Sequence, residues 1–394
     1  MDRRIFLCAN VKFPRGEAGA NYVQYLALAL KERNWKVIII GEGENRQEDY
    51  KEGKGFYEYR GIEYFNLDIK DRRILNFVTY NFMYGKYYRE ALERYGLCKE
   101  DYVYLYSSSL SLIYYVKKLI PKERLSISIV EWHRPFQFRM NFISPSYIMT
   151  RYSYRYIHQN ISKIFPISTM LERYYIRNSC STLLLPAMAD PMEYEYLSSK
   201  GRDGKLIFIY SGAKSTRHED AIESMFRAFL LLDEEERNRV EFHITGLSRS
   251  RILKVIHEDE QLLTDLGSLL IIHKWLEYNE LINLYLQADY LLLARNDNAV
   301  TRANFPSKIP EILCYGVIPV CTDIGDYTKL YLRDKENSII FDGCSAEECV
   351  LAIRRALTLS DEERERLREN CRKTALIQFN YRAWSDKISN FIME

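Results

Sequence analysis

Short apolar segments alternate with helical segments along almost the whole of this 394-residue chain. The apolar segments at residues 4–9, 37–40 and 206–210 are nearly continuous runs of aliphatic and aromatic side chains. Such runs are typical of strands that are buried on both faces, as in a parallel sheet. Strands that alternate with helices of about 10–15 residues predict parallel sheets with right-handed crossovers. The pattern therefore predicts an α/β fold.

The alternation occurs twice, which predicts two doubly wound, Rossmann-like domains. In the first half we expect a helix over residues 22–33 and strands at residues 4–9, 37–40, 102–106, 126–130 and 163–166. In the second half we expect strands at residues 206–210, 240–245, 269–273, 290–294 and 318–321, helices at 219–232, 247–258, 279–287 and 307–315, a polar loop at 295–304, and a helical tail at 346–391. Ligands of such folds bind at the carboxyl ends of the strands. We therefore expect the active site in a central cleft that the two domains face.

The two halves differ in charge. Residues 1–200 hold 30 Lys and Arg against 22 Asp and Glu, and residues 201–394 hold 26 against 32. This difference favours two domains with different partners. A stretch with Pro186, Pro191, Gly201 and Gly204 is the expected linker, over residues 185–204. We expect domains at 1–190 and 201–375, and a final helix at 376–394 that folds back toward the first domain.

Composition excludes several classes of protein. Apolar residues make up 47% and charged residues 28% of the chain, which is the balance of a globular protein and not of a disordered one. No apolar run is long enough for a membrane span, and the apolar run after the start is too short for a signal peptide. The eight cysteines form no Cys-x-x-Cys pair, so we expect free thiols, no zinc site and a cytoplasmic protein.

The most informative motif is ANFPSKIPEILCYGVIPV at residues 303–320. Pro306 and Ser307 suit the start of a helix, and Gly316 suits its left-handed end. The amides near Ser307 and Lys308 then form a site for an anion. Glu311 lies one turn further on and suits hydrogen bonds from a diol such as a ribose. The alternative is an ordinary helix with a solvated lysine and glutamate.

A second loop, SGAKSTRHED at residues 211–220, directly follows the first strand of its domain and precedes a helix. Phosphate groups bind at that position in doubly wound folds. Gly212 allows close backbone approach, and Lys214 and Arg217 suit the charge of a diphosphate. The spacing matches neither G-x-G-x-x-G nor the P-loop, so a plain charged loop is the alternative.

Together these segments resemble the retaining family 4 glycosyltransferases and their relatives of GT-B fold. IFIYSGAKSTRHEDAIESMFRA at 207–228 is similar to the strand, glycine loop and helix that open the donor domain. FHITG at 242–246, WLEYNELINLYLQADYLLL at 275–293 and the 303–320 motif resemble later parts of that domain, in the same order. The tail resembles the family's C-terminal helices. The resemblance covers nearly the whole chain.

The resemblance implies that residues 201–375 bind a nucleotide-sugar donor and residues 1–190 bind the acceptor. It implies that Glu311 binds the ribose and that Lys214 and Arg217 bind the diphosphate. The family often has another glutamate eight residues before the one that Glu311 matches. This chain has Ala303 at that position. That difference leaves open how the donor sugar is held. Asp297 and Asn298 are weaker candidates for replacement contacts.

In the first half, the resemblance matches Gly16 and Gly19 to a loop that borders the cleft. It matches His133, in VEWHRPF, to a position near the donor sugar, which makes His133 the tentative catalytic candidate. Glu131 and Arg134 are weaker candidates. A simple turn at the glycines and a structural histidine are the alternatives.

Residues 132–177 hold seven basic residues against one acidic residue, Glu172, with aromatic residues throughout. Three interpretations remain open: stacking with single-stranded nucleic acid, contact with an anionic lipid surface, or an ordinary core with a solvated basic face. We expect no nucleic-acid partner. The second interpretation predicts peripheral contact with the inner face of a membrane.

The sequence thus predicts a glycosyltransferase that moves a sugar from a UDP-sugar or GDP-sugar to a saccharide or lipid-linked saccharide hydroxyl, in surface polysaccharide or glycolipid synthesis in bacteria. The resemblance implies retention of the anomeric configuration. We expect basic side chains, and not a metal ion, to neutralise the diphosphate. We expect no cofactor. The alternatives are an epimerase or phosphorylase of the same fold, or a nucleotide-sugar-binding protein without turnover.

Overall fold

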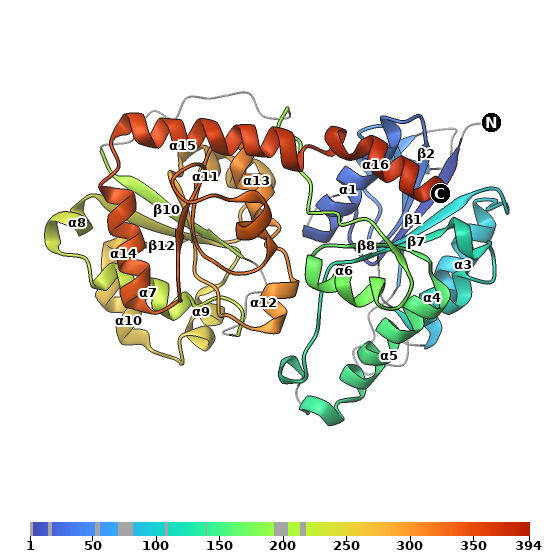
Figure 1. Ribbon diagram of the computed structural model, residues 1–394, viewed down its shortest axis with the longest axis horizontal. Coiled ribbons are helices and arrows are strands. Elements are labelled where there is room, and N and C mark those ends of the chain that lie inside the picture. The colour runs from blue at the N-terminus through green and yellow to red at the C-terminus, as the bar shows by residue number, and fades with distance from the viewer. Residues whose placement is uncertain are drawn as a thin grey trace. The chain divides into compact units, whose positions relative to one another are not determined.

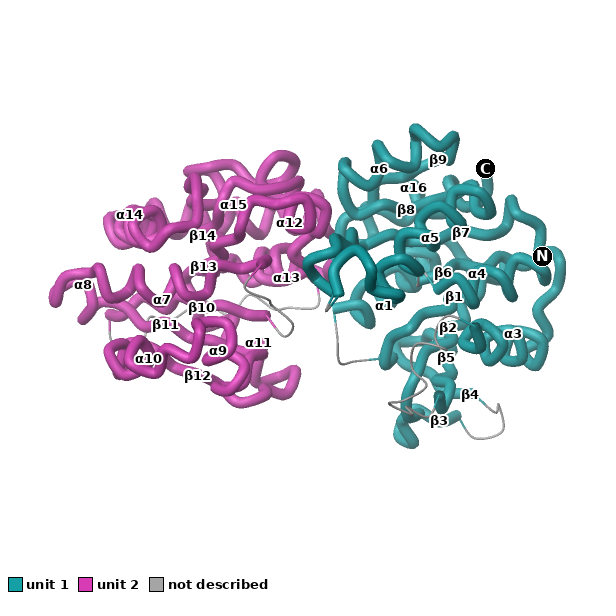
Figure 2. The backbone as a smooth tube through the Cα atoms, turned by 90° about the horizontal axis from the view of Figure 1, so that it is seen from below, with its two compact units in different colours: residues 1–188, 381–394 teal, residues 189–380 magenta. Residues whose placement is uncertain are grey.

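The structure, a computed structural model, describes residues 3–14, 18–51, 56–69, 82–106, 109–138, 140–192, 204–212 and 218–394. It divides the chain into two compact units (Figure 2). Unit 1 comprises Met1–Met188 and Tyr381–Glu394, and unit 2 comprises Ala189–Asn380.

The sheet of unit 1 has the order β3-β4-β5-β2-β1-β6-β7-β8-β9. Its strands are β1 (Arg4–Ala9), β2 (Lys36–Glu42), β3 (Tyr50–Lys51), β4 (Phe56–Tyr59), β5 (Ile62–Leu67), β6 (Tyr102–Tyr106), β7 (Leu125–Ile129), β8 (Lys163–Pro166) and β9 (Ser181–Thr182). The pairings are parallel except where β4 meets β3 and β5. The described α-helices are α1 (Ala18–Lys31), α3 (Tyr84–Arg94), α4 (Leu110–Val116), α5 (Pro145–Asn160), α6 (Thr169–Ile176) and α16 (Tyr381–Met393). α1 packs with α16, and α4 packs with α3 and α5 (Figure 1).

The sheet of unit 2 is wholly parallel in its described pairings and has the order β12-β11-β10-β13-β14-β15. Its strands are β10 (Leu206–Ser211), β11 (Val240–Thr245), β12 (Leu270–Ile272), β13 (Tyr290–Leu293), β14 (Ile318–Thr322) and β15 (Ile339–Phe341). Its described α-helices are α7 (Ile222–Leu230), α8 (Glu234–Asn238), α9 (Arg249–Val255), α10 (Glu260–Leu266), α11 (Tyr278–Gln287), α12 (Ala299–Ala303), α13 (Lys308–Cys314), α14 (Ala346–Leu357) and α15 (Asp361–Thr374). α7 packs with α10 and α14 on one face of the sheet, and α13 packs with α15 on the other (Figure 1).

The prediction of two doubly wound α/β domains is confirmed. In unit 2 its own first strand, β10, lies at the centre, and the next strands are added outward first on one side and then on the other. The central strands are fully apolar on both faces; Phe208, Ile209 and Leu292, for example, are completely buried. Burial on both faces is why these segments are continuous apolar runs.

Three local predictions need correction. The first helix begins at Ala18 and not at Tyr22. The hairpin of β4 and β5 was not expected. The segment expected to be a polar loop at 295–304 contains the short helix α12, which begins because the Asn298 side chain accepts hydrogen bonds from the amides of Val300 and Thr301.

Candidate functional site

The strand order of unit 2 places a switch point between β10 and β13. On one side of this point the connections run toward β12, and on the other side toward β15. In open α/β sheets ligands bind outside the carboxyl ends of the strands at such a point. Ser211 ends β10, and Arg295 follows the end of β13. The candidate site is therefore built from the residues around these two positions.

Lys308 and Glu311 form an ion pair at the start of α13. The Lys308 ammonium donates to Glu311 Oε2 at 2.8 Å, and both side chains are largely but not completely buried. The pair forms because residues three apart lie on the same face of a helix. Pro310 is tolerated between them because the first turn of a helix needs no backbone donor at that position. Gly316 ends this segment with a φ of 72°, as predicted.

Tyr285 of α11 joins this pair to the end of β10. The Tyr285 side chain is completely buried, and its hydroxyl lies 3.0 Å from Ser211 Oγ. Burial and the nearby Glu311 carboxylate raise the pKa of Tyr285 to about 12, so its hydroxyl keeps its proton at neutral pH. Burial acts to lower the pKa of Lys308, but Glu311 and Tyr285 together outweigh it and raise that pKa. Lys308 is therefore a fixed positive charge.

Gly212 follows Ser211 and lies against the Tyr210 hydroxyl. A Cβ at this position would be 2.6 Å from that oxygen, which is closer than real contacts. The same hydroxyl donates to Asp220 Oδ2 at 2.6 Å. Glycine is needed here because the Tyr210 side chain, anchored by Asp220, occupies the space that a Cβ would take.

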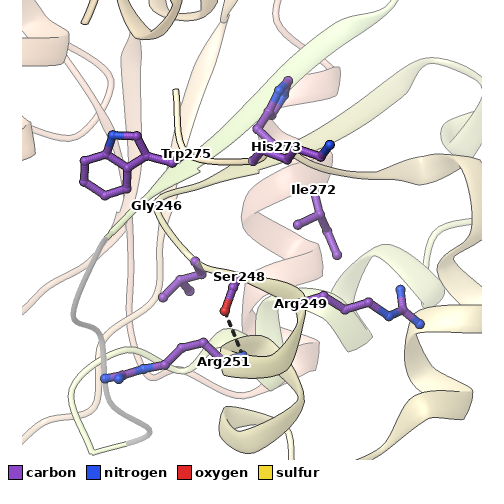
Figure 3. A pocket seen from close by; sticks show the side chains of 9 residues that line it. Gly246, Ser248, Arg249, Arg251, Ile272, His273 and Trp275 are labelled. Atoms are coloured by element: carbon purple, nitrogen blue, oxygen red, sulfur yellow. Dashed lines mark hydrogen bonds between the residues drawn. The ribbon is translucent and has the colours of Figure 1, made fainter. Parts of the chain in front are cut away.

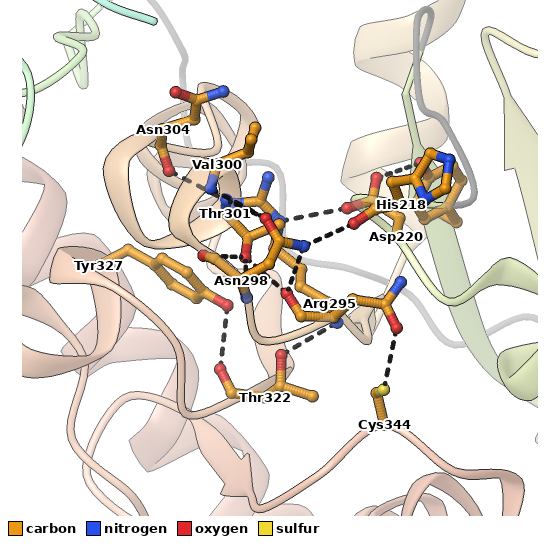
Figure 4. A network of polar contacts seen from close by, with 12 residues as sticks. His218, Asp220, Arg295, Asn298, Val300, Thr301, Asn304, Thr322, Tyr327 and Cys344 are labelled. Atoms are coloured by element: carbon orange, nitrogen blue, oxygen red, sulfur yellow. Dashed lines mark hydrogen bonds and ion pairs between the residues drawn. The ribbon is translucent and has the colours of Figure 1, made fainter. Parts of the chain in front are cut away.

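Asp220 also pairs with Arg295 across the switch point. Arg295 Nε lies 3.2 Å from Asp220 Oδ1, and both side chains are almost fully buried. The Arg295 amide donates to Thr322 Oγ1, and the Asn298 side chain donates to the His218 carbonyl (Figure 4). This network ties the segment before α7 to the ends of β13 and β14, and so it fixes the framework around the Lys308–Glu311 pair.

Ala303 is completely buried in α12. The position therefore presents a methyl group to the core and no carboxylate. Asp297 is exposed and forms an ion pair with Arg302, and Asn298 caps α12.

A pocket of about 670 Å³ lies at the carboxyl ends of β11 and β12 (Figure 3). One side consists of Gly246 to Ser248 together with Arg249 and Arg251, at the start of α9, and the other consists of residues 272–275. Ser248 caps α9 by accepting from the Arg251 amide at 3.3 Å. The indole of Trp275 is 67% exposed beside the pocket. The lining therefore combines an aromatic face with basic side chains.

His273, in the wall of this pocket, contacts a second histidine. Its Nε2 lies 3.1 Å from Nδ1 of His243 in β11, and His243 Nε2 lies 3.2 Å from Glu241 Oε2. Burial, and then the neighbouring His243, lower the pKa of His273. The neutral form of His273 is thus favoured in the folded protein.

Unit 1 has its own switch point, between β1 and β6. Gly19, in the first turn of α1, lies there, and a Cβ on it would be 2.9 Å from Val11 and 3.1 Å from the Tyr106 ring. Its close packing explains the glycine without a ligand. His133 follows β7, with Nε2 3.3 Å from Glu131 Oε2 and its ring 6.0 Å from the Phe138 ring.

The residues predicted from the sequence divide into three groups. The structure brings Lys308 and Glu311 together, with Ser307 at the cap of the same helix. It places Gly212 at the end of β10, and Gly19 and His133 in unit 1. Gly16, Lys214 and Arg217 lie outside the described residues. Their roles, and those of the other candidates, stay predictions.

Sequence reasoning missed Tyr285, Arg295 and the pocket residues Arg249, Arg251 and Trp275. Ligands of open α/β sheets bind at the carboxyl ends of the strands. Lys274 and Trp275 directly follow the strand predicted at 269–273, so the sequence alone could have indicated this wall of the pocket. Tyr285 gives no such signal, because its neighbour Ser211 is 74 residues away.

The described residues contain neither a metal-binding cluster nor a membrane-spanning helix. No group of three or more His, Cys, Asp or Glu side chains there is placed to hold a metal ion. None of the helices there combines the length and the apolar character of a membrane span.

The eight cysteines are free thiols, and six of them are buried.

Comparison with known proteins links unit 2 to a family. Residues 197–374 match the model of the family described as Glycosyl transferases group 1. Comparison with curated protein sequences gives no match.

Solved structures match nearly the full length of the chain. Sucrose-phosphate synthase from Thermosynechococcus elongatus has a TM-score of 0.75 and 15% identity, covering 98% of both chains. HepE from Anabaena, solved with UDP-glucose, has a TM-score of 0.69 and 10% identity, covering 98% of both chains. WaaG, a glycosyltransferase involved in lipopolysaccharide biosynthesis, has a TM-score of 0.70 and 14% identity, covering 98% of this chain and 99% of its own. At these identities the likeness shows a shared fold.

The fold is thus GT-B, the architecture of these glycosyltransferase structures. The family match covers the described strands and helices that carry the Lys308–Glu311 pair and the pocket. The chain is a glycosyltransferase, and its residues 197–374 are similar to the family described as Glycosyl transferases group 1.

Proposed function

We propose that this protein transfers a sugar from a UDP-sugar to a hydroxyl group of a saccharide or lipid-linked saccharide. The observation that carries the proposal is the Lys308–Glu311 pair, held by Tyr285 at the switch point of unit 2. HepE and a trehalose-6-phosphate enzyme from E. coli with the same fold were solved with UDP-sugars, which supports uridine over guanosine.

Lys308 supplies the charge that the reaction needs. As the glycosidic bond breaks, the leaving diphosphate gains negative charge. A fixed cation in a partly dehydrated site stabilises that charge without reorganising. Glu311 keeps Lys308 oriented, and its second oxygen suits a bond from a ribose hydroxyl, which a carboxylate accepts strongly. The prediction that Lys214 and Arg217 add to the diphosphate site belongs to this proposal.

The pocket beside Trp275 suits the other end of the donor. An exposed indole offers a face for a planar base. Arg249 and Arg251 lie at the opposite wall and suit the phosphate side of a nucleotide. The base and the diphosphate then lie along the carboxyl edge of one sheet.

The proposal includes retention of the anomeric configuration, metal-independent transfer, and a role in surface polysaccharide or glycolipid synthesis. The likeness of the chain to WaaG supports the last point. Lys308 supports metal independence, because an ammonium group offers positive charge to the diphosphate, as a divalent ion does in other transferases.

The test is release of UDP from a panel of UDP-sugars, alone and with saccharide acceptors, in the presence of EDTA. We expect UDP release to continue in EDTA and the product to keep the anomeric configuration of the donor, as read by NMR. Loss of activity in EDTA with recovery in magnesium contradicts the metal-independent mechanism. An inverted product contradicts retention, and binding of GDP in preference to UDP contradicts the assigned nucleotide.

A further inference from the structure

Large apolar side chains are concentrated on one exposed part of unit 1. Six of the nineteen exposed large apolar side chains in the described residues fall between positions 136 and 152. These six are Phe136, Met140, Phe142, Ile143, Ile148 and Tyr152. Five of them lie on α5 and on the two short 3₁₀ turns before it, Pro135–Gln137 and Asn141–Ile143, and Met140 directly precedes the second turn. We call the six the α5 surface. In Figure 1, α5 and these turns extend away from the sheet of unit 1.

Phe142 and Ile143 are the most exposed members, at 73% and 70%. The segment around them is held by packing among its own rings. The Phe138 and Tyr147 rings are 5.5 Å apart, and the Phe142 and Tyr147 rings are 6.0 Å apart. Two side chains of this size are therefore held outward on a structured base. Exposing such side chains costs solubility, so a contiguous patch of them marks a binding surface.

The helix itself has two distinct faces. Ser153, Tyr154 and Ile157 are buried against unit 1. Ile148, Tyr152 and Arg155 are exposed at spacings of four and three residues, which places them along one stripe. The stripe continues the apolar surface of the turns and ends at a positive charge.

The segment that carries the α5 surface has charges of one sign only. Residues 132–171 contain no aspartate or glutamate. Arg134 and Arg155 are exposed at its edges. The neighbouring acid, Glu131, lies against His133. An apolar centre with a basic edge complements a bilayer with anionic headgroups, in which apolar side chains enter the interface and arginines meet phosphates.

We propose that the α5 surface docks unit 1 on an anionic lipid bilayer. The inference goes beyond the donor chemistry and does not depend on it. Phe142 and Ile143 enter the interface, Tyr152 lies at the headgroup level, and Arg134 and Arg155 contact lipid phosphates. An enzyme held in this way reaches acceptors that are themselves attached to lipid.

The experiment is co-sedimentation of the full chain with vesicles of phosphatidylglycerol mixed with phosphatidylcholine, and with phosphatidylcholine alone. We expect binding to the anionic vesicles that weakens as salt rises from about 50 mM to about 500 mM. Phe142→Ser/Ile143→Ser should weaken binding by roughly tenfold or more, because two large apolar groups no longer enter the interface. The matched control Leu351→Ser/Ile377→Ser removes two similarly exposed side chains from unit 2 and should leave binding unchanged.

A second pair of variants tests the charge. Arg134→Gln/Arg155→Gln should remove most of the salt dependence, whereas Arg366→Gln/Lys373→Gln, on α15, should not. Donor hydrolysis without vesicles should be the same in wild type, in Phe142→Ser/Ile143→Ser and in the two control variants on unit 2, which separates this inference from the proposed function. Equal sedimentation of wild type and Phe142→Ser/Ile143→Ser overturns the proposal. Self-association of the wild type that the same substitutions abolish also overturns it, because a second copy then covers the surface.

Discussion

At the scale of single residues, the candidate site depends on contacts that side chains make across elements. Lys308 and Glu311 are neighbours by helical spacing, but Tyr285 fixes them from another helix. Tyr210 similarly lies against Gly212 and is held there by its hydrogen bond to Asp220. Both tyrosines are almost completely buried, so each acts as a rigid support under a residue that faces the site.

Substitution at Gly212 tests this support. Gly212→Ala places a methyl group against the Tyr210 hydroxyl, so it should lower the free energy of unfolding by about 1–3 kcal/mol. Gly212→Ala/Tyr210→Phe removes the oxygen that clashes and should recover part of that loss. Urea unfolding measures both. If the double variant is less stable than the sum of the single changes predicts, the clash is not with Tyr210.

The sequence predicted some of these residues and could not predict others. Lys308 and Glu311 are visible because a proline, a serine and a glycine mark the helix that carries them. Tyr285 is one of 32 tyrosines, and only the tertiary fold distinguishes it. Ala303 reads in the sequence as a missing carboxylate, and the structure adds that the position is buried.

At the scale of elements, fully buried strands were easier to predict than half-buried ones. β6, β8 and β11 have the predicted bounds, because an apolar strand between polar loops has clear ends. The β4–β5 hairpin was missed because it turns through Arg60 and Gly61, both with positive φ, and Arg-Gly is not among the usual turn pairs. α12 has only five residues, too few for a periodic signal, and it depends on its Asn298 cap.

His273, which directly follows β12, predicts that the stability of unit 2 depends on pH. The folded state lowers the pKa of His273 below its ordinary 6.5, so the unfolded chain binds the proton first as pH falls. This contribution to stability is complete above about pH 6.5 and is lost as pH falls from there through the lowered folded pKa.

We therefore expect urea to unfold unit 2 more easily at about pH 5.5 than at about pH 7.5, and His273→Gln to flatten this difference. His257→Asn is the matched control, since His257 is exposed and has a φ of 58°, which asparagine tolerates. An unchanged pH dependence in His273→Gln, or a flattened one in His257→Asn, contradicts the assignment.

At the scale of the whole molecule, the last helix belongs to the first unit. The Trp35 indole donates to Ser389 Oγ at 2.9 Å, and the Lys163 ammonium donates to the Ile392 carbonyl at 2.6 Å. Phe391 also packs edge-on against Phe165 of β8. Unit 1 is therefore closed by residues 381–394, which follow unit 2 in the sequence.

Because α16 is part of unit 1, a core substitution in this helix should destabilise unit 1 and leave unit 2 unchanged. Ile392→Ala leaves a cavity under α16 and should destabilise unit 1 by about 2–5 kcal/mol. Hydrogen exchange should show faster exchange of the amides of β1 and β8, with β10 and β13 unchanged. The matched control Ile353→Ala, in α14 and equally buried, should give the reverse pattern. Equal loss of protection in both units contradicts the division of the chain.

The central claim is that the Lys308–Glu311 pair holds the nucleotide of the donor, and calorimetric titration with UDP tests it most directly. Glu311→Gln removes a charge-assisted contact of about 1.5–3 kcal/mol, so affinity should fall roughly ten- to a hundredfold while the fold survives. Glu236→Gln is the matched control, because Glu236 also pairs with a basic side chain, Arg354, at 2.8 Å, on a helix away from the site. The account predicts weaker binding in Glu311→Gln and wild-type binding in Glu236→Gln. Wild-type affinity for UDP in Glu311→Gln would contradict it.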